Sequence, residues 1–227
     1  MDEIRVNVER VQERVARAAE RGGRRAEDVL LIAVSKTVDV DRIRQAVAAG
    51  VRALGENRVQ EAKEKVAILG RPVPWHLIGH LQTNKVRDAL ALFDVIHSID
   101  RLELARECDR RARSGGRVVD GLLEVNVAGE ASKSGFAPGE VAVALEAVAQ
   151  LDHVRLHGLM AIPPPVEDAR DARRWFRELR GLAERHGLKE LSMGMSADFE
   201  VAIEEGATMV RVGTAIFGAR PAPGART

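Results

Sequence analysis

Short apolar segments alternate with longer amphipathic segments along this chain, and the alternation limits the possible folds to a few. Residues 29–34 (VLLIAV) form a continuous apolar run, which is typical of a strand buried on both faces. The segments between such runs repeat apolar residues at helical spacing, and several end at a glycine such as Gly50, Gly70 or Gly206. Strands that alternate with helices build βαβ units, and these units predict a parallel sheet.

We expect eight strands, at residues 29–34, 51–54, 75–79, 94–99, 118–127, 154–160, 190–194 and 207–212. The expected helices between them lie at residues 40–49, 57–69, 83–92, 101–113, 139–150, 167–186 and 197–205. Eight such units in 227 residues predict one α/β domain over residues 1–227, a single (β/α)8 TIM-type barrel. A doubly wound open sheet is the alternative. We expect residues 219–227 to form a short C-terminal tail.

An extra amphipathic helix is expected ahead of the first strand. Over residues 3–21, apolar side chains recur at helical spacing, with Val8, Val11 and Val15 on one face. Few residues follow the last strand, so its helix must be short or missing. The N-terminal helix is therefore expected to cover that gap in the outer ring.

Charge and cysteine content exclude several classes of protein. Lys and Arg total 35 against 34 Asp and Glu, so the sequence lacks the basic excess that is typical of nucleic-acid-binding proteins. The single cysteine, Cys108, allows no intramolecular disulfide and fits a reducing compartment. The first residues include Asp2 and Glu3 and lack the apolar core of a signal peptide, and no apolar run approaches the ~20 residues of a membrane span. We expect a cytoplasmic protein with no membrane or nucleic acid partner.

Lys36 is the most informative polar residue, because binding groups of such barrels lie at the C-terminal ends of the strands. It directly follows the first apolar run, so its stem should pack in the barrel mouth. Desolvation disfavours an ammonium ion, and a neutral amine can attack a carbonyl to form a Schiff base. The alternative is a lysine whose ammonium group reaches solvent past an apolar stem.

Three residues near the last two strands predict an anion site. Ser196 precedes the expected helix 197–205, where it would cap the helix beside free backbone N–H groups. Gly213 permits close approach to the backbone, and Thr214 adds a hydroxyl. Phosphate sites in these barrels often use the loops after strands seven and eight. The alternative is a purely structural cap and turn.

Arg211 lies within the last strand on the same side as Gly213. A guanidinium directed into the barrel needs a partner, and the structural alternative is an ion pair with Glu124 or Asp198. His80 is the histidine best placed for a site, after the third strand. The six histidines form no HExxH or Cys/His cluster, so we expect no metal site.

Eight motifs occur in order between about residue 29 and residue 218, and they resemble one family. They are AVSKT (33–37), GENRVQE (55–61), WHLIGHLQTNK (75–85), HSID (97–100), SKSGF (132–136), HGLM (157–160), LSMGMSADFEVAIEEGAT (191–208) and RVGTAIFG (211–218). The family is that of the pyridoxal-phosphate homeostasis proteins, small relatives of the alanine racemase N-terminal barrel.

The resemblance implies pyridoxal 5′-phosphate (PLP) bound to Lys36 as an internal aldimine. It further implies that Ser196, Gly213 and Thr214 hold the phosphate and that Arg211 faces the pyridine nitrogen. Asn57 and His80 are expected near the ring.

The chemistry expected of such a site is restrained. An arginine keeps its proton and repels a pyridinium, so the ring nitrogen should stay neutral and carbanions should be poorly stabilised. Alanine racemase has a second base, a tyrosine from another domain, whereas this sequence contains no tyrosine and we expect no such domain.

We therefore expect a non-catalytic PLP carrier or regulator that maintains cofactor supply and amino-acid and keto-acid balance. Apo forms of PLP-dependent enzymes are its possible acceptors, and we expect a monomer or weak homodimer. One rival is a low-activity amino acid racemase or related amino-acid-transforming enzyme. The other is a barrel aldolase that uses Lys36 without a cofactor.

Overall fold

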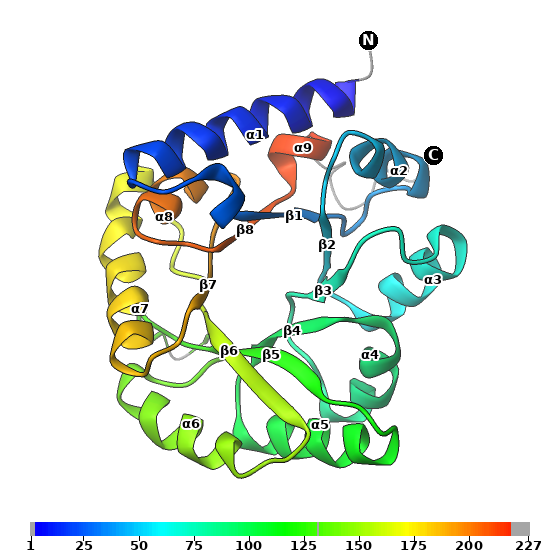
Figure 1. Cartoon of the computed structure of the whole chain (residues 1–227), viewed down its shortest axis with the longest axis vertical. Helices are drawn as coiled ribbons and strands as arrows, with labels where there is room; N and C mark the ends of the chain where they lie inside the picture. Colours follow the sequence, from blue (N-terminus) through cyan, green and yellow to red (C-terminus); the bar gives the residue numbers. More distant parts are fainter. Residues whose placement is uncertain (1–2, 131, 219–227) are drawn as a thin grey trace.

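Eight parallel strands close into a barrel in the computed structural model, which describes residues 3–130 and 132–218 (Figure 1). Each strand pairs with the next along the chain, and β8 returns to β1. The strands are β1 (Leu30–Val34), β2 (Ala53–Glu56), β3 (Trp75–Leu77), β4 (Val95–Ile99), β5 (Val119–Glu124), β6 (Val154–Met160), β7 (Glu190–Met195) and β8 (Met209–Val212). The predicted (β/α)8 barrel is confirmed, and the doubly wound alternative is wrong.

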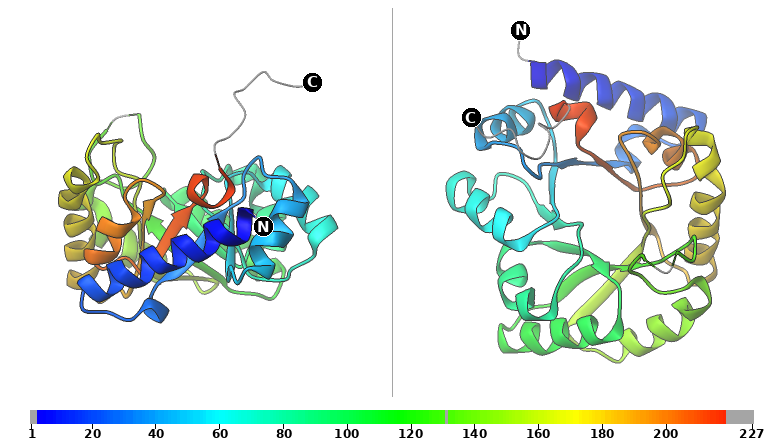
Figure 2. Two further views of the ribbon diagram at one scale, coloured as in Figure 1. Left: turned by 90° about the horizontal axis from the view of Figure 1, so that it is seen from above. Right: turned by 180° about the vertical axis from the view of Figure 1, so that it is seen from behind.

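The helices surround the strands, as the two further views make clear (Figure 2). They are α1 (Glu3–Arg21), α2 (Val40–Ala48), α3 (Val59–Leu69), α4 (Val86–Leu92), α5 (Leu102–Ser114), α6 (Val141–Ala149), α7 (Arg173–Arg185), α8 (Phe199–Glu204) and α9 (Thr214–Phe217). Four short 3₁₀ helices lie in the connections: η1 (Ala26–Asp28), η2 (Thr83–Lys85), η3 (Pro138–Glu140) and η4 (Ala169–Ala172).

Helix α1 covers the place where the outer ring is thinnest. The helix after β8, α9, has only four residues, and α1 lies across it and along α8 (Figure 1). Its apolar face, which includes Val8, Val11 and Val15, is buried. The side chain of Asn7 donates a hydrogen bond to the carbonyl of Ile216 at 3.0 Å. The predicted role of the N-terminal helix is confirmed, whereas the predicted tail 219–227 lies outside the described residues.

Several predicted boundaries were wrong by a few residues. The second strand begins at Ala53 rather than at residue 51, because Val51 donates its N–H to Ala46 and so belongs to the end of α2. The expected helix 167–186 begins as an α-helix only at Arg173, after the 3₁₀ turn η4. The expected helix 197–205 is α8, which begins at Phe199.

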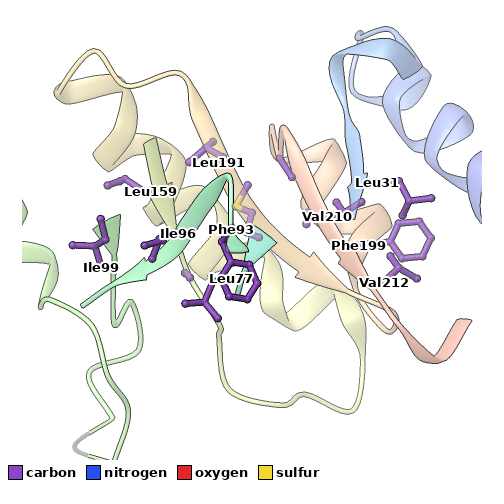
Figure 3. Packing of buried hydrophobic residues seen from close by; sticks show 14 of the residues in the cluster. Leu31, Leu77, Phe93, Ile96, Ile99, Leu159, Leu191, Phe199, Val210 and Val212 are labelled. Carbon is purple, nitrogen blue, oxygen red and sulfur yellow. The ribbon is translucent and has the colours of Figure 1, made fainter. Parts of the chain in front are cut away.

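Tight packing between strands and helices fixes the barrel wall. A Cβ at Gly158 in β6 would lie 1.8 Å from the carbonyl oxygen of Glu190 in β7, so only glycine fits there. Phe199 of α8 lies on the side of β8 where Leu31 and Val212 are found (Figure 3). All three are buried, and α8 packs on β7 and β8, the strands that lead to the candidate site.

Candidate functional site

A cavity of about 380 Å³ opens at the C-terminal ends of the strands. Its volume is typical of a small-molecule site. All six residues predicted to bind a cofactor line it: Lys36, Asn57, Ser196, Arg211, Gly213 and Thr214. The closed barrel places the first and last strands side by side, since Ile32 of β1 pairs with Arg211 of β8. This pairing explains why Lys36, near the start of the sequence, lies in the same cavity as Arg211 and Gly213.

Lys36 lies in a turn directly after β1 and is half-buried at the cavity. The turn is unusual because the next residue, Thr37, has a positive φ of 61°. The left-handed region is unfavourable for a β-branched residue, so surrounding contacts must hold the turn. Lys36 thus lies at the mouth of the barrel, where the sequence predicted it.

Ser196 does not cap the helix that follows it in sequence, so that prediction was wrong. Asp198 is the residue before α8, and its carboxylate accepts the N–H of Met195 at 2.6 Å, which holds Ser196 in the intervening turn. The Ser196 hydroxyl instead accepts N–H groups of Gly213 at 3.2 Å and Ala215 at 3.4 Å. It therefore meets the start of α9, and the two loops after β7 and β8 form one polar cradle.

A glycine shapes this cradle. Gly194 in β7 has a φ of 88°, and a Cβ there would lie 2.5 Å from the Cβ of Ala202 and 3.0 Å from the Cα of Phe199. The backbone turn that carries Ser196 towards β8 therefore depends on a residue without a side chain.

Arg211 is buried and reaches the cavity as a charged group. Its Nη1 donates to the Ser192 hydroxyl at 2.6 Å, and its Nη2 donates to the Ala161 carbonyl at 2.9 Å. Burial lowers the pKa of the guanidinium to about 10, although Asp198 and Glu124 oppose that shift. It thus stays protonated at neutral pH. Within the described residues it forms these hydrogen bonds, not the direct ion pair considered from the sequence.

Two buried histidines extend this contact through the barrel interior. His97 Nδ1 lies 2.8 Å from the Ser192 hydroxyl, and His97 Nε2 lies 2.8 Å from His76 Nδ1. Arg211 has only donors, so it donates to the Ser192 hydroxyl. The Ser192 hydroxyl then donates to His97 Nδ1, and the N–H at His97 Nε2 donates to His76 Nδ1. Burial lowers the pKa of His76 to about 4 and that of His97 well below its usual value, so both rings are neutral in the native protein.

The sequence patterns indicated no role for His76, His97 or Ser192. The contact between His97 and Ser192 joins residues 95 positions apart on strands that do not pair, so no local motif reveals it.

Asn57 lines the cavity, whereas His80 lies next to it. Within the described part of the chain, the buried Oδ1 of Asn57 has no hydrogen-bond partner, so an acceptor is available to a ligand. His80 lines an adjoining pocket that it shares with Asn57, and its Nδ1 lies 2.7 Å from a carboxylate oxygen of Asp100. The structure thus groups Asn57, but not His80, with Lys36.

The described residues offer neither a metal cluster nor a membrane-spanning helix. Residues 3–130 and 132–218 contain no group of three or more His, Cys, Asp or Glu residues that could hold a metal ion. No described helix is both long and apolar enough to cross a membrane.

Comparison with known proteins defines the class of this barrel. Residues 2–221 match the family described as "Alanine racemase, N-terminal domain", and the chain belongs to that family. Among structures of the same fold is an alanine racemase from Clostridium difficile 630, with a TM-score of 0.74, 17% identity, and coverage of 98% of this chain and 57% of that one.

More similar proteins narrow the assignment. A protein of Pseudomonas aeruginosa named "Pyridoxal phosphate homeostasis protein" is 47% identical, covering 97% of each chain. One of the same name from Aquifex aeolicus is 46% identical over 93% of this chain and 96% of its own. The structure of PipY from Synechococcus elongatus with PLP bound is 42% identical, with a TM-score of 0.77 and coverage of 84% of this chain and 93% of that one. The chain therefore belongs to the pyridoxal phosphate homeostasis protein family.

Proposed function

We propose that this protein binds PLP in the cavity of Lys36 and serves as a carrier that maintains cofactor supply. Through that supply it would influence amino-acid and keto-acid balance. The observation that carries the proposal is that an amine, the polar cradle around the Ser196 hydroxyl and a buried guanidinium line one cavity. The family name of the relatives and the PLP in the PipY structure support it.

The chemistry of the lining residues fits this ligand. Lys36 supplies the amine, which condenses with an aldehyde to form a Schiff base and one water molecule. Ser196 and Thr214 supply hydroxyl donors, which suit a phosphate, and the N–H of Gly213 holds the Ser196 hydroxyl beside the cavity. The Oδ1 of Asn57, which has no hydrogen-bond partner among the described residues, would accept a donor from the ligand.

Arg211 supports a carrier rather than an efficient enzyme. Held by Ser192 and Ala161, its guanidinium can donate to a ring nitrogen but gives up no proton near neutral pH. When bound in this way, PLP supplies an electrophilic carbon but only a weak electron sink. We therefore expect exchange of amines at Lys36 without robust turnover.

A low-activity amino acid racemase is the second candidate, because the fold is that of the alanine racemase barrel. Steady-state turnover of a panel of D- and L-amino acids by the purified, PLP-loaded protein distinguishes the two functions. Robust rates would contradict the carrier function, whereas rates near background would support it.

The acceptors of the cofactor, the location of the protein and its oligomeric state are also proposals. Apo forms of PLP-dependent enzymes are the acceptors we propose, and we propose a cytoplasmic monomer or weak homodimer. Mixing the loaded protein with an apo-enzyme and following the regain of that enzyme's activity tests transfer. Activity that returns no faster than with an equal amount of free PLP would contradict direct delivery.

Absorption spectroscopy tests the binding proposal. Adding PLP to the purified protein should produce a visible band, and Lys36→Ala should abolish it. Lys63→Ala, which changes an exposed lysine of α3, should leave the band unchanged. The absence of a visible band from the native protein after incubation with PLP would contradict the proposal and favour an aldolase that uses Lys36 alone.

A further inference from the structure

The backbone of Lys36 is held by a buried ionic cluster that lies outside the cavity lining. We define the cluster as Lys65 and Glu61 of α3 and Glu56 of β2. The Lys65 side chain is 8% exposed and that of Glu56 is fully buried, whereas that of Glu61 is 25% exposed. Arginine outnumbers lysine in this sequence, so a buried lysine needs a specific reason.

All three protons of the Lys65 ammonium are used. Its Nζ donates to the Ser35 carbonyl at 2.6 Å, to Glu56 Oε1 at 2.7 Å and to Glu61 Oε1 at 2.6 Å. An ammonium group has three donors, so its capacity is filled. One of these three hydrogen bonds is made to the carbonyl of the peptide that joins Ser35 to Lys36.

Glu61 holds the other side of Lys36. Its Oε1 accepts the backbone N–H of Thr37 at 2.5 Å, and that N–H belongs to the peptide joining Lys36 to Thr37. Lys65 and Glu61 therefore hold both peptide groups that flank Lys36, and a mutual ion pair joins them. The positive φ of Thr37 is the kind of unfavourable conformation that such contacts can maintain.

Glu56 ties the cluster to the barrel. Its Oε1 accepts the hydroxyl of Ser35 at 2.7 Å in addition to the Lys65 ammonium. The cluster is therefore anchored on β2, the strand that pairs with β1 and lies beside the turn. Movement of α3 would be transmitted to the Lys36 backbone through these bonds.

We propose that Lys65 and Glu61 are positioning residues that orient Lys36 for its reaction with the PLP aldehyde. The inference rests on the proposed function. In the reaction the lone pair of Lys36 Nζ attacks the aldehyde carbon, a C=N bond forms, and the aldehyde oxygen leaves as water with the two amine protons. No oxidation or reduction occurs. Neither Lys65 nor Glu61 lines the cavity, so neither is a catalytic residue.

A positioning role predicts a specific kinetic pattern. In Lys65→Met and Glu61→Ala, the limiting rate of visible-band formation should fall about tenfold to a hundredfold, because small misplacement of a reacting group costs such factors. The PLP concentration that gives half the limiting rate should change little. Binding of pyridoxine 5′-phosphate, which lacks the aldehyde, should also change little.

The matched control is Lys63→Met, on the exposed face of the same helix, and it should react at the native rate. Circular dichroism establishes that each variant is folded. Should Lys65→Met fail to fold, Glu61→Ala decides the question alone, since its side chain is partly exposed and Lys65 keeps Glu56 as a partner.

The outcomes separate this inference from the function on which it rests. A folded Glu61→Ala that reacts at the native rate would overturn the positioning role and leave PLP binding intact. Equal losses of rate and of pyridoxine 5′-phosphate affinity would also overturn it, since they would indicate general damage to the site. A native protein that never forms the visible band would instead contradict the proposed function.

Discussion

The hydroxyl of Ser196 links the two loops that form the anion cradle. It accepts N–H groups at the start of α9, although its place in the sequence suggested the following helix. Its role depends on a contact between residues 17 positions apart, and only the closed barrel brings those residues together. The identity of the residue was therefore predictable, but its partners were not.

Replacement of Ser196 tests the cradle. Ser196→Ala should raise the dissociation constant of pyridoxine 5′-phosphate about tenfold or more, because a hydrogen bond to a charged group contributes roughly 1.5–3 kcal/mol. Fluorescence titration measures the affinity. Ser114→Ala, at an exposed position of α5, is the control and should bind normally. An unchanged affinity in Ser196→Ala would argue against a phosphate at this position.

The neutral state of His76 is a second prediction at the level of single residues. Burial depresses its pKa to about 4 in the folded protein, so the unfolded chain takes up a proton at higher pH than the native one. The free energy of unfolding should therefore fall as the pH drops from about 6.5 to about 4, with His76 contributing up to roughly 3 kcal/mol.

An NMR titration of the histidine ring protons measures this directly. The His76 signal should shift with a midpoint near 4, and the exposed His186 gives a reference signal in the same spectra. A His76 midpoint at the ordinary value of about 6.5 would show that the ring is not desolvated.

At the scale of elements, the turn after β7 is set by backbone geometry. Gly194 combines a positive φ with close contacts to α8, and α8 is in turn packed on β7 and β8. The pattern of alternating strands and helices predicted both neighbouring elements. The helix expected at residues 197–205 begins two residues later, because the Asp198 carboxylate accepts the N–H of Met195 and residues 196–198 form a turn. The sequence pattern did not reveal this contact.

Gly194→Ala should destabilise the protein by roughly 2 kcal/mol or more. The alanine would have to adopt an unfavourable positive φ, and its Cβ would overlap with the Cβ of Ala202. Gly139→Ala is the control, since a Cβ there has no neighbour within 4 Å and its φ is not positive. Chemical denaturation measures both. Equal stability of the two variants would contradict the conformational role of Gly194.

For the whole molecule, hydrophobic periodicity was sufficient to predict the barrel and the helix that covers α9. The strand ends and the family resemblance together then identified six residues that the structure gathers in one cavity. The supporting residues could not be found in this way. His97 contacts Ser192 across the barrel interior, and Lys65 contacts Ser35 from a helix 30 positions later. His97 and Ser192 are polar residues within short strands, whereas Lys65 lies in a helix with several other charged residues, and its sequence does not distinguish it from them.

Covalent binding of PLP by Lys36 is best tested by mass spectrometry after borohydride reduction. Reduction of the PLP-treated protein converts a C=N bond into a stable amine before digestion. A phosphopyridoxyl group should appear on the peptide containing Lys36, and none should appear there in Lys36→Ala. Its absence from Lys36, or label spread evenly over the exposed lysines, would show that Lys36 does not hold PLP covalently.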